Sequence, residues 1–298
     1  MNRKKLIAFS ISLAMTVVPV TPAAAAGAEQ NTEGLQNAVL DLEFENSLED
    51  SSGKGNNGTL SSGEAEYVDG VVGKGLKMNG SSYVNLGNST DLQPENLTLS
   101  FWIRPDSDMK GEELISWNKN EWYTDGWYLS SENDNTPLTL SVGPAKTNGQ
   151  PYRVSVSGKR SEFLPTGEWT HIAVTYDKDS KEICFYRNGV KCSTVTTYGI
   201  SGESTGVLGS DATMEKSIGY NGPKYKGAYL KASLDEYQLY NDVATPEEVI
   251  ALYEESGQTF DRKAVAQADL DKISIPETTQ ENLSLPTTGE SGSVISWS

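Results

Sequence analysis

The chain has 298 residues, and its 41 Asp and Glu residues outnumber its 24 Lys and Arg residues to give a formal net charge of −17. An acidic protein repels phosphate backbones and anionic lipids, so this charge argues against nucleic acid as a partner and against adsorption to a membrane. The 28 Gly and 12 Pro residues are typical of an all-β protein, in which many turns consume small and polar residues. Length alone predicts about two domains.

The N-terminus has the three parts of a secretory signal peptide. Residues 2–5 are mostly cationic, residues 6–20 form an apolar run, and residues 22–26 are small enough for a signal peptidase. The apolar run is short for a membrane span of about 20 residues. We therefore expect residues 1–26 to be a signal peptide, the mature chain to have no membrane span, and the protein to be secreted or held at the cell surface.

Between Val39 and Tyr240 short runs of alternating apolar and polar residues are separated by turn residues. Such alternation indicates half-buried strands in antiparallel sheets. Without interleaved helices, about a dozen strands of this kind predict one large sandwich of two sheets. The clearest runs are residues 40–44, 97–103, 138–142, 152–156 and 171–176.

The first predicted helix covers residues 245–256. Thr245 is its expected N-cap, Pro246 takes the first helical position, and Gly257 ends it. We expect residues 257–268 to be a linker. Beyond it, residues 268–276, 283–286 and 294–298 are predicted strands, which indicate the start of a second β-domain.

Two cysteines flank a hairpin signal, Asn188-Gly189. A three-residue loop with Gly189 in the bulge position would place Cys184 opposite Cys192 and permit a disulfide in an oxidising compartment. A two-residue Asn-Gly turn would shift the pairing by one residue and direct the thiols to opposite faces, where each would be a small buried hydrophobe. We favour the disulfide. Two Cys and one His do not make a usual zinc site.

The Gly-rich loop at residues 50–58 is a candidate calcium site. Its carbonyls can turn inward beside Asp50 and Asn56, and Ca²⁺ prefers about six to eight oxygen ligands. The alternative is that Asp50 and Asn56 satisfy the turn backbone as Asx-turns.

Aromatic residues crowd one stretch of the chain among amide and carboxylate side chains. Aromatic rings stack on the apolar faces of sugars, and amides and carboxylates bind sugar hydroxyls. Trp117 and Trp127 flank β-runs, so a place in the core is the alternative for both. Trp122 and Tyr123 have the character of loop residues, and Tyr225 lies in a later loop. These last three are the candidate carbohydrate-binding residues.

Four blocks of sequence follow one another in a fixed order: residues 42–60 with 73–84, residues 97–105, residues 168–177 running into the hairpin, and residues 218–240 closing with the helix. Together they resemble the laminin-G-like jelly roll of the concanavalin A-like lectins and glucanases. The resemblance covers residues 39 to 256 and departs where the family usually has Phe and this chain has Tyr229. We therefore expect an all-β, two-sheet antiparallel jelly-roll sandwich over residues 37–256, with a short C-terminal helix.

The resemblance also implies a metal near the 50–58 loop, with Asp235 of the final strand close by. Residues 269–298 resemble the start of a bacterial immunoglobulin-like domain, on the strength of residues 283–289 and 295–297. The combination is similar to the non-catalytic front of secreted bacterial glycoside hydrolases that degrade arabinan or xylan.

Catalytic carboxylates are missing from the sequence pattern. Related glucanases carry their acids on alternate positions of one strand, so that they point into one cleft. Here Asp235 and Glu236 are adjacent and are expected to face opposite sides of their sheet, and the sole histidine, His171, belongs to a strand. We expect no catalytic residue in these 298 residues.

The leading functional hypothesis is a monomeric, non-catalytic carbohydrate-binding module that holds a polysaccharide-degrading enzyme on its polysaccharide or glycan. One alternative is the N-terminal part of a glycoside hydrolase whose catalytic module lies beyond Ser298. Another is a structural or protein-binding module of the cell surface. Ca²⁺ is the one cofactor implied.

Overall fold

The computed structural model describes residues 15–17, 35–36, 38–106, 113–119, 126–146, 150–192, 195–198, 215–220, 229–273 and 285–297. The chain divides into two compact units. The larger unit consists of residues 30–260, and the smaller one combines residues 1–29 with residues 261–298.

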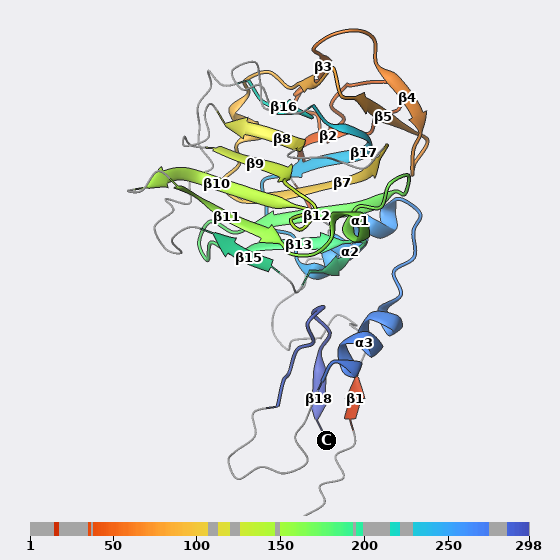
Figure 1. Cartoon of the computed structure of the whole chain (residues 1–298), viewed down its shortest axis with the longest axis vertical. Helices are drawn as coiled ribbons and strands as arrows, with labels where there is room; N and C mark the ends of the chain where they lie inside the picture. The colour runs from red at the N-terminus through yellow and green to blue at the C-terminus, as the bar shows by residue number, and fades with distance from the viewer. Residues whose placement is uncertain are drawn as a thin grey trace, which may run out of the picture. The chain divides into compact units, whose positions relative to one another are not determined.

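Two eight-stranded antiparallel sheets build the larger unit in the described part of the chain (Figure 1). The first sheet has the order β15 (Val195–Tyr198), β11 (Gln150–Val156), β10 (Thr139–Lys146), β9 (Gly126–Ser131), β8 (Glu113–Lys119), β16 (Ser217–Ile218), β6 (Val84–Asn85) and β3 (Thr59–Leu60). The second has the order β14 (Val190–Lys191), β13 (Ile183–Arg187), β12 (Thr170–Tyr176), β7 (Leu97–Pro105), β17 (Lys231–Tyr240), β5 (Lys74–Asn79) and β4 (Glu66–Asp69), and β2 (Ala38–Leu42) also pairs with β17. The expected all-β sandwich is confirmed.

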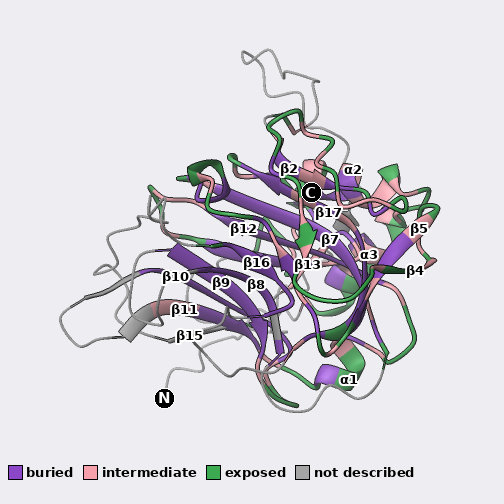
Figure 2. Cartoon of the chain, turned by 90° about the horizontal axis from the view of Figure 1, so that it is seen from above, coloured by how far each residue is buried: buried purple, intermediate pink, exposed green. Residues whose placement is uncertain are grey.

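The core lies between the two sheets and is built from alternate residues of their strands. The first sheet contributes residues such as Leu129 and Leu140, and the second contributes Phe101, Val174 and Leu239. In Figure 2 the central strands of both sheets are coloured as buried. Each such side chain stabilises the fold by about 1.5–3 kcal/mol when it leaves water. Alternation therefore leaves every second residue of each strand on an outer face of the sandwich.

The hairpin β13–β14 has the two-residue Asn188-Gly189 turn, with Arg187 opposite Val190. This register directs Cys184 and Cys192 to opposite faces of their sheet, so the predicted disulfide is wrong. Cys184 packs with a small cluster on the outer face, whereas Cys192 packs against the core, and both thiols are free. Asn188 and Gly189 both have positive φ, at 50° and 78°, as the tight turn requires.

Helix α2 (Pro246–Glu255) covers part of the outer face of the second sheet. Thr245 caps it by accepting the N–H of Glu248, whose carboxylate accepts the N–H of Thr245 in return. The predicted cap, the first-turn proline and the stop at Gly257 are therefore confirmed. Short helical turns also occur at η1 (Thr90–Leu92) and α1 (Arg160–Phe163).

The smaller unit contains helix α3 (Arg262–Asp271), and strand β1 (Met15–Val17) pairs antiparallel with β18 (Ile295–Trp297). The helix occupies part of the expected linker and the start of the strand predicted from residue 268. It forms because Asp261 caps its N-terminus, and because Ala266 and Asp269, three positions apart, are both buried on one side of it. Strand β1 falls inside the expected signal peptide, whose other residues lie outside the described ranges. None of the described helices combines the length and the apolar character that a bilayer span needs.

Candidate functional site

One cross-strand row of side chains runs along the outer face of the first sheet. Strand pairing places Ser217 opposite Trp117, Trp117 opposite Tyr128, Tyr128 opposite Ser141, and Ser141 opposite Arg153. We call these five residues the outer row. Their sequence neighbours on the same strands, such as Leu140 and Val154, belong to the core, so the outer row points away from it.

The centre of the outer row combines stacked aromatic rings with buried hydroxyls. Trp117 and Tyr128 stack with their centroids 5.4 Å apart, and they are only 2% and 1% exposed. The hydroxyls of Ser141 and of Ser130, on the same face, are fully buried and have no hydrogen-bond partner in the structure. A buried hydroxyl without a partner costs about 1–3 kcal/mol, so both positions reduce the stability of the fold and call for a functional explanation.

Arg153, the last of these five residues, forms an ion pair with Glu132, and the register continues beyond it to Tyr198 of β15. The Nη2 of Arg153, on β11, contacts Oε1 of Glu132, which directly follows β9, so the pair reaches over the intervening strand β10. The Nε of Arg153 has no hydrogen-bond partner among the described residues. The two side chains are 29% and 19% exposed, so the pair is partly buried and in contact with solvent over part of its surface.

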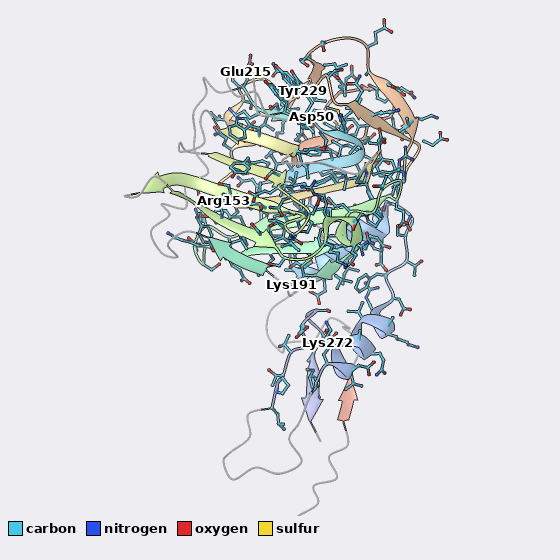
Figure 3. The ribbon with its side chains drawn as sticks, viewed as in Figure 1. Asp50, Arg153, Lys191, Glu215, Tyr229 and Lys272 are labelled. Atoms are coloured by element: carbon cyan, nitrogen blue, oxygen red, sulfur yellow. The ribbon has the colours of Figure 1, made fainter. Side chains whose placement is uncertain are left out.

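Three stacked tyrosines lie at the Ser217 end of the row. The rings of Tyr220 and Tyr229 are nearly parallel with centroids 4.3 Å apart, and Tyr83 stacks on Tyr220 at 5.2 Å. The hydroxyl of Ser217 donates to the carbonyl of Tyr220 at 2.5 Å, which ties this stack to the row. Tyr83 and Tyr229 are half-buried. Figure 3 labels Arg153 and Tyr229, which mark the two ends of this surface.

The 50–58 loop is held together by the carboxylate of Asp50. Its Oδ1 accepts the N–H groups of Asp41 and Ser52, at 2.9 and 3.0 Å, and its Oδ2 accepts the N–H of Asn56 and the hydroxyl of Ser52, at 2.8 and 2.9 Å. Asn56 donates its amide to the carbonyl of Val39 at 2.7 Å. These bonds hold the pKa of Asp50 below its usual value against the opposing effect of burial. Four donors leave the Asp50 carboxylate no lone pair for a cation, so its arrangement fits the Asx-turn alternative.

Asp235 stabilises the loop between β4 and β5 in the same way, by accepting hydrogen bonds from its backbone. Its Oδ2 accepts the N–H groups of Val71 and Val72, at 2.7 and 3.0 Å, and its Oδ1 accepts the N–H of Glu236. Burial outweighs these bonds and raises its pKa to about 6. Within the described ranges, no group of three or more His, Cys, Asp or Glu side chains is arranged to hold a metal ion. The calcium site predicted at Asp50, Asn56 and Asp235 stays an untested prediction.

A β-bulge in β17 changes where Glu236 points. The register shifts between Asp235 and Gln238, and Glu236 has a φ of +47°, a conformation that L residues rarely adopt. As a result Glu236 lies on the outer face of the second sheet together with Asp235, and the expectation that the two face opposite sides is wrong. Burial first, and then repulsion by Asp235 and other carboxylates, raises the pKa of Glu236 to about 8.

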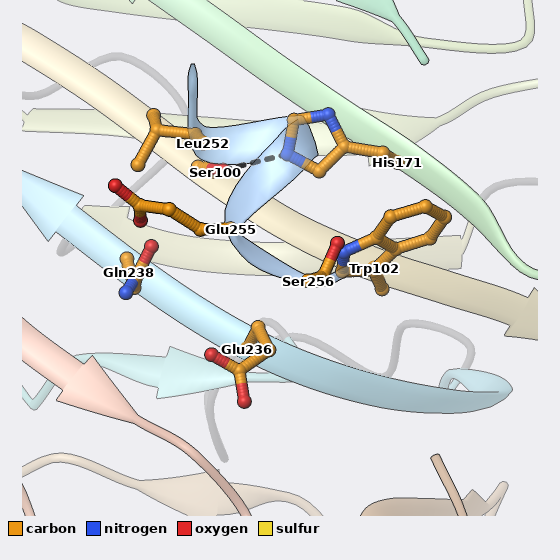
Figure 4. A pocket seen from close by; sticks show the side chains of 8 residues that line it. All are labelled: Ser100, Trp102, His171, Glu236, Gln238, Leu252, Glu255 and Ser256. Atoms are coloured by element: carbon orange, nitrogen blue, oxygen red, sulfur yellow. Dashed lines mark hydrogen bonds between the residues drawn. The ribbon is translucent and has the colours of Figure 1, made fainter. Parts of the chain in front are cut away.

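Glu236 lines a small pocket between the second sheet and helix α2 (Figure 4). Inside it the Nε2 of His171 and the hydroxyl of Ser100 are 2.9 Å apart. Burial lowers the pKa of His171 to about 3, and its Nδ1 has no partner in the described part of the chain, so no carboxylate orients the ring as hydrolytic triads require. The cavity volume of about 20 Å³ accommodates one water molecule and no sugar ring. It is lined by Ser100, Trp102, His171, Glu236, Gln238, Leu252, Glu255 and Ser256.

The candidate carbohydrate-binding residues Trp122, Tyr123 and Tyr225 lie outside the described residues. Trp127 is in the core, which was the alternative to a binding role for this residue. Trp117 is buried on the outer face instead. Sequence reasoning missed the other members of the outer row because they come from strands far apart in the chain. The one signal available was alternation, since Tyr128, Ser141 and Arg153 each stand next to apolar residues of the core.

Comparisons with known proteins place this geometry in a family. A family model described as the concanavalin A-like lectin/glucanases superfamily, of laminin G type, matches residues 78–250, which is more than half of the chain. No curated protein matches the chain.

Among solved structures, domain 4 of AbnA, an extracellular GH43 arabinanase from Geobacillus stearothermophilus in complex with arabinotriose, is 23% identical. It aligns with a TM-score of 0.52 over 73% of this chain and 100% of its own. The binding domain of Paraclostridial Mosquitocidal Protein 1 has a TM-score of 0.56 at 23% identity over 74% of this chain, and botulinum neurotoxin type C has one of 0.55 at 17% identity over 74%. The match spans about half of each toxin chain, 52% and 51%. At such identities these structures show the fold alone; the family model, which covers most of the sandwich, shows that the chain belongs to the concanavalin A-like lectin/glucanase superfamily.

Proposed function

We propose that the chain is a secreted, non-catalytic carbohydrate-binding module that holds a polysaccharide-degrading enzyme on its substrate. The observation that carries this proposal is the outer row, where stacked aromatic rings adjoin buried hydroxyls without partners. Sugars are complementary to both features. Their C–H faces stack on aromatic rings, and their hydroxyls donate and accept hydrogen bonds.

The dimensions of the row suit a chain of several linked sugars. From β16 to β11 the row crosses four strand spacings, or about 19 Å. Its two ends are partly exposed, at the tyrosine stack and at the Arg153–Glu132 pair, while its centre is covered. A ligand therefore meets the partly exposed side chains at the tyrosine stack and at the Arg153–Glu132 pair, and an extended oligosaccharide is long enough to reach both, whereas a single terminal sugar is not.

Two of the similar structures support a glycan as the ligand class. The arabinanase domain is described in complex with arabinotriose, and the cell entry of botulinum neurotoxin type C is described as dependent on interaction with two ganglioside molecules. We take the neutral arabinan class as the first ligand to test, because arabinotriose is the oligosaccharide in the arabinanase-domain complex.

The test replaces the unpartnered hydroxyls. If they bind sugar, their loss weakens glycan binding without lowering the melting temperature, whereas if they stabilise the fold, their loss lowers the melting temperature. Replacing Ser130 and Ser141 by Ala removes two buried orphan groups, so the melting temperature should stay equal or rise slightly. Each lost hydrogen bond to a sugar should weaken binding by about fivefold, measured as retention on insoluble arabinan and by calorimetry with arabinan oligosaccharides.

Ser155→Ala is the matched control. The hydroxyl of Ser155 bonds that of Thr139 at 2.7 Å on the same face, so this variant should lose stability through an internal hydrogen bond. If the protein is retained on no neutral polysaccharide, the glycan-binding proposal fails. If the purified protein releases reducing sugar, the non-catalytic part of the proposal fails.

A further inference from the structure

The Arg153–Glu132 pair is the partly exposed part of the outer row on the β11 side, with Tyr198 of β15 opposite Arg153. We propose that this pair makes the face selective for uncharged glycans, with Glu132 as the specificity-determining residue that cancels the charge of Arg153. The inference rests on the proposed glycan-binding function and adds to it the class of glycan selected.

The placement of the pair puts it in contact range of any ligand on the row. Arg153 is itself a member of the row, opposite Ser141. Its guanidinium forms an ion pair with Glu132 on the other side of β10. The unpartnered hydroxyl of Ser141 therefore lies beside the unpartnered Nε of Arg153 on one face. A hydroxyl and a guanidinium, both capable of binding sugar hydroxyls, thus come from neighbouring positions of the row.

Pairing with Glu132 determines whether the guanidinium of Arg153 binds acidic or uncharged ligands. A lone guanidinium binds carboxylates through two parallel charge-assisted hydrogen bonds, which makes it the residue of choice for acidic groups. Here one Nη2 contact already belongs to a carboxylate of the protein, so an incoming carboxylate meets Glu132 as a like charge. A sugar hydroxyl meets no such repulsion and can accept a hydrogen bond from the partly exposed guanidinium.

The net charge of the protein does not by itself make the outer row selective against acidic glycans. At physiological ionic strength charges are screened beyond about 8 Å, so distant carboxylates contribute little at the row. The partly buried pair is screened much less, because its two side chains keep only 29% and 19% of their exposure. Selectivity at close range is thus set by Glu132.

The experiment compares retention on immobilised arabinan, which is neutral, with retention on immobilised polygalacturonate, which is acidic. The variants are Glu132→Gln, Arg153→Gln and the double variant. Glu66→Gln is the matched control, since Glu66 pairs with Lys77 at 3.4 Å on the second sheet and its loss changes the net charge equally.

Glu132→Gln should raise the ratio of acidic to neutral binding by about tenfold, with a gain that falls as salt is added. The double variant and Glu66→Gln should show no such gain, because the first lacks the guanidinium and the second leaves the pair intact. Melting curves of all variants verify that each one folds.

Three outcomes overturn the inference. If the parent binds arabinan but Glu132→Gln keeps the parental ratio, the pair does not set selectivity, and the proposed function stands without it. If Glu66→Gln raises the ratio as much as Glu132→Gln, net charge is responsible. If the parent binds neither polysaccharide, the proposed function falls and this inference falls with it.

Discussion

Glu236 lies in an environment that its residue type does not prefer. A β-bulge turns it to the outer face at a φ of +47°, beneath helix α2 and among other acids. The groups that face it are Asp41, Glu43, Glu45, Asp235, Glu255 and the neutral His171. Strain and charge crowding at one position are costs that the rest of the fold must offset.

We predict that Glu236 makes stability fall as the pH rises. Its pKa in the folded protein is about 8, against an ordinary value of 4.5, so the folded state binds this proton more tightly than the unfolded state does. The stability from this group is fully present below about pH 4.5 and is lost as the pH rises to about 8. Glu236→Gln should therefore raise the melting temperature at pH 8.5 by roughly 3 °C, or about 1 kcal/mol after solvent screening, and leave it unchanged at pH 4.5.

Differential scanning calorimetry at the two pH values measures this difference. Glu247→Gln, on the exposed first turn of α2, is a control that should not share the pH dependence, beyond a small loss at the helix N-terminus at both pH values. Equal shifts of the Glu236→Gln variant at both pH values would refute the electrostatic explanation.

The two cysteines give a second prediction for single residues. Because the hairpin register separates them, a reducing agent should leave the melting temperature unchanged, whereas a disulfide would contribute about 2–4 kcal/mol. Burial raises the pKa of Cys192 to about 12 and raises that of Cys184, so both thiols should resist alkylation until the protein unfolds. Mass spectrometry of unreduced protein that still shows a linked pair after denaturation would contradict the register.

At the scale of elements, strands and caps are predictable from the sequence, and irregular backbone is not. Alternation locates β7, β12 and the other long strands, and Thr245, Pro246 and Gly257 delimit α2. The bulge at Glu236 is invisible to alternation, because one extra residue shifts every later side chain without changing residue types. The turn at Asn188-Gly189 is compatible with two registers, and only the observed pairing of β13 with β14 decides between them.

The candidate site is less predictable for a reason of topology. Ser217 and Arg153 are 64 positions apart and become members of one row only through the strand order β16, β8, β9, β10, β11. Serine and arginine on a strand have the ordinary pattern of a solvated face, so nothing in their own segments identifies them. What sequence does supply is the aromatic enrichment around Trp117.

The 50–58 loop offers a prediction for one element. Since Asp50 accepts four hydrogen bonds from the loop and from β2, Asp50→Ala should destabilise the protein by about 2–3 kcal/mol. The loss should be equal in EDTA and in millimolar Ca²⁺, because these bonds need no metal. A parent melting temperature that falls in EDTA and recovers with Ca²⁺, together with an Asp50→Ala variant that no longer responds, would instead establish the calcium site.

At the scale of the whole molecule, the sandwich contains complete sheets and a continuous core, so we expect it to fold independently. All strands of both sheets and helix α2 lie within residues 30–260, and the two sheets bury one continuous core. A domain of this size buries roughly 70% of its unfolded surface, so it needs no metal or disulfide to be stable. The sequence indicated this unit but placed its end at residue 256.

Phe260 determines where the larger unit should end. Its half-buried ring lies over Gly189 at the tip of the hairpin, where an added Cβ would come within 2.8 Å of it, and it meets Tyr253 edge-on at 6.4 Å. Its N–H also donates to the carboxylate of Glu254 at 3.2 Å. Ending the chain after Gly257 removes these contacts while leaving every strand and all of α2 in place.

We therefore predict that residues 30–260 unfold in one cooperative transition, with equal calorimetric and van't Hoff enthalpies. The shorter chain, residues 30–257, should also unfold cooperatively but at a melting temperature lower by roughly 3 °C, because partial burial of one Phe ring contributes about 1 kcal/mol. Phe260→Ala in the longer chain should reproduce that loss, which separates the effect of the ring from that of chain length. Equal melting temperatures for the two lengths would place the end of the unit at the helix, and failure of both to fold would show that the sandwich depends on residues 261–298.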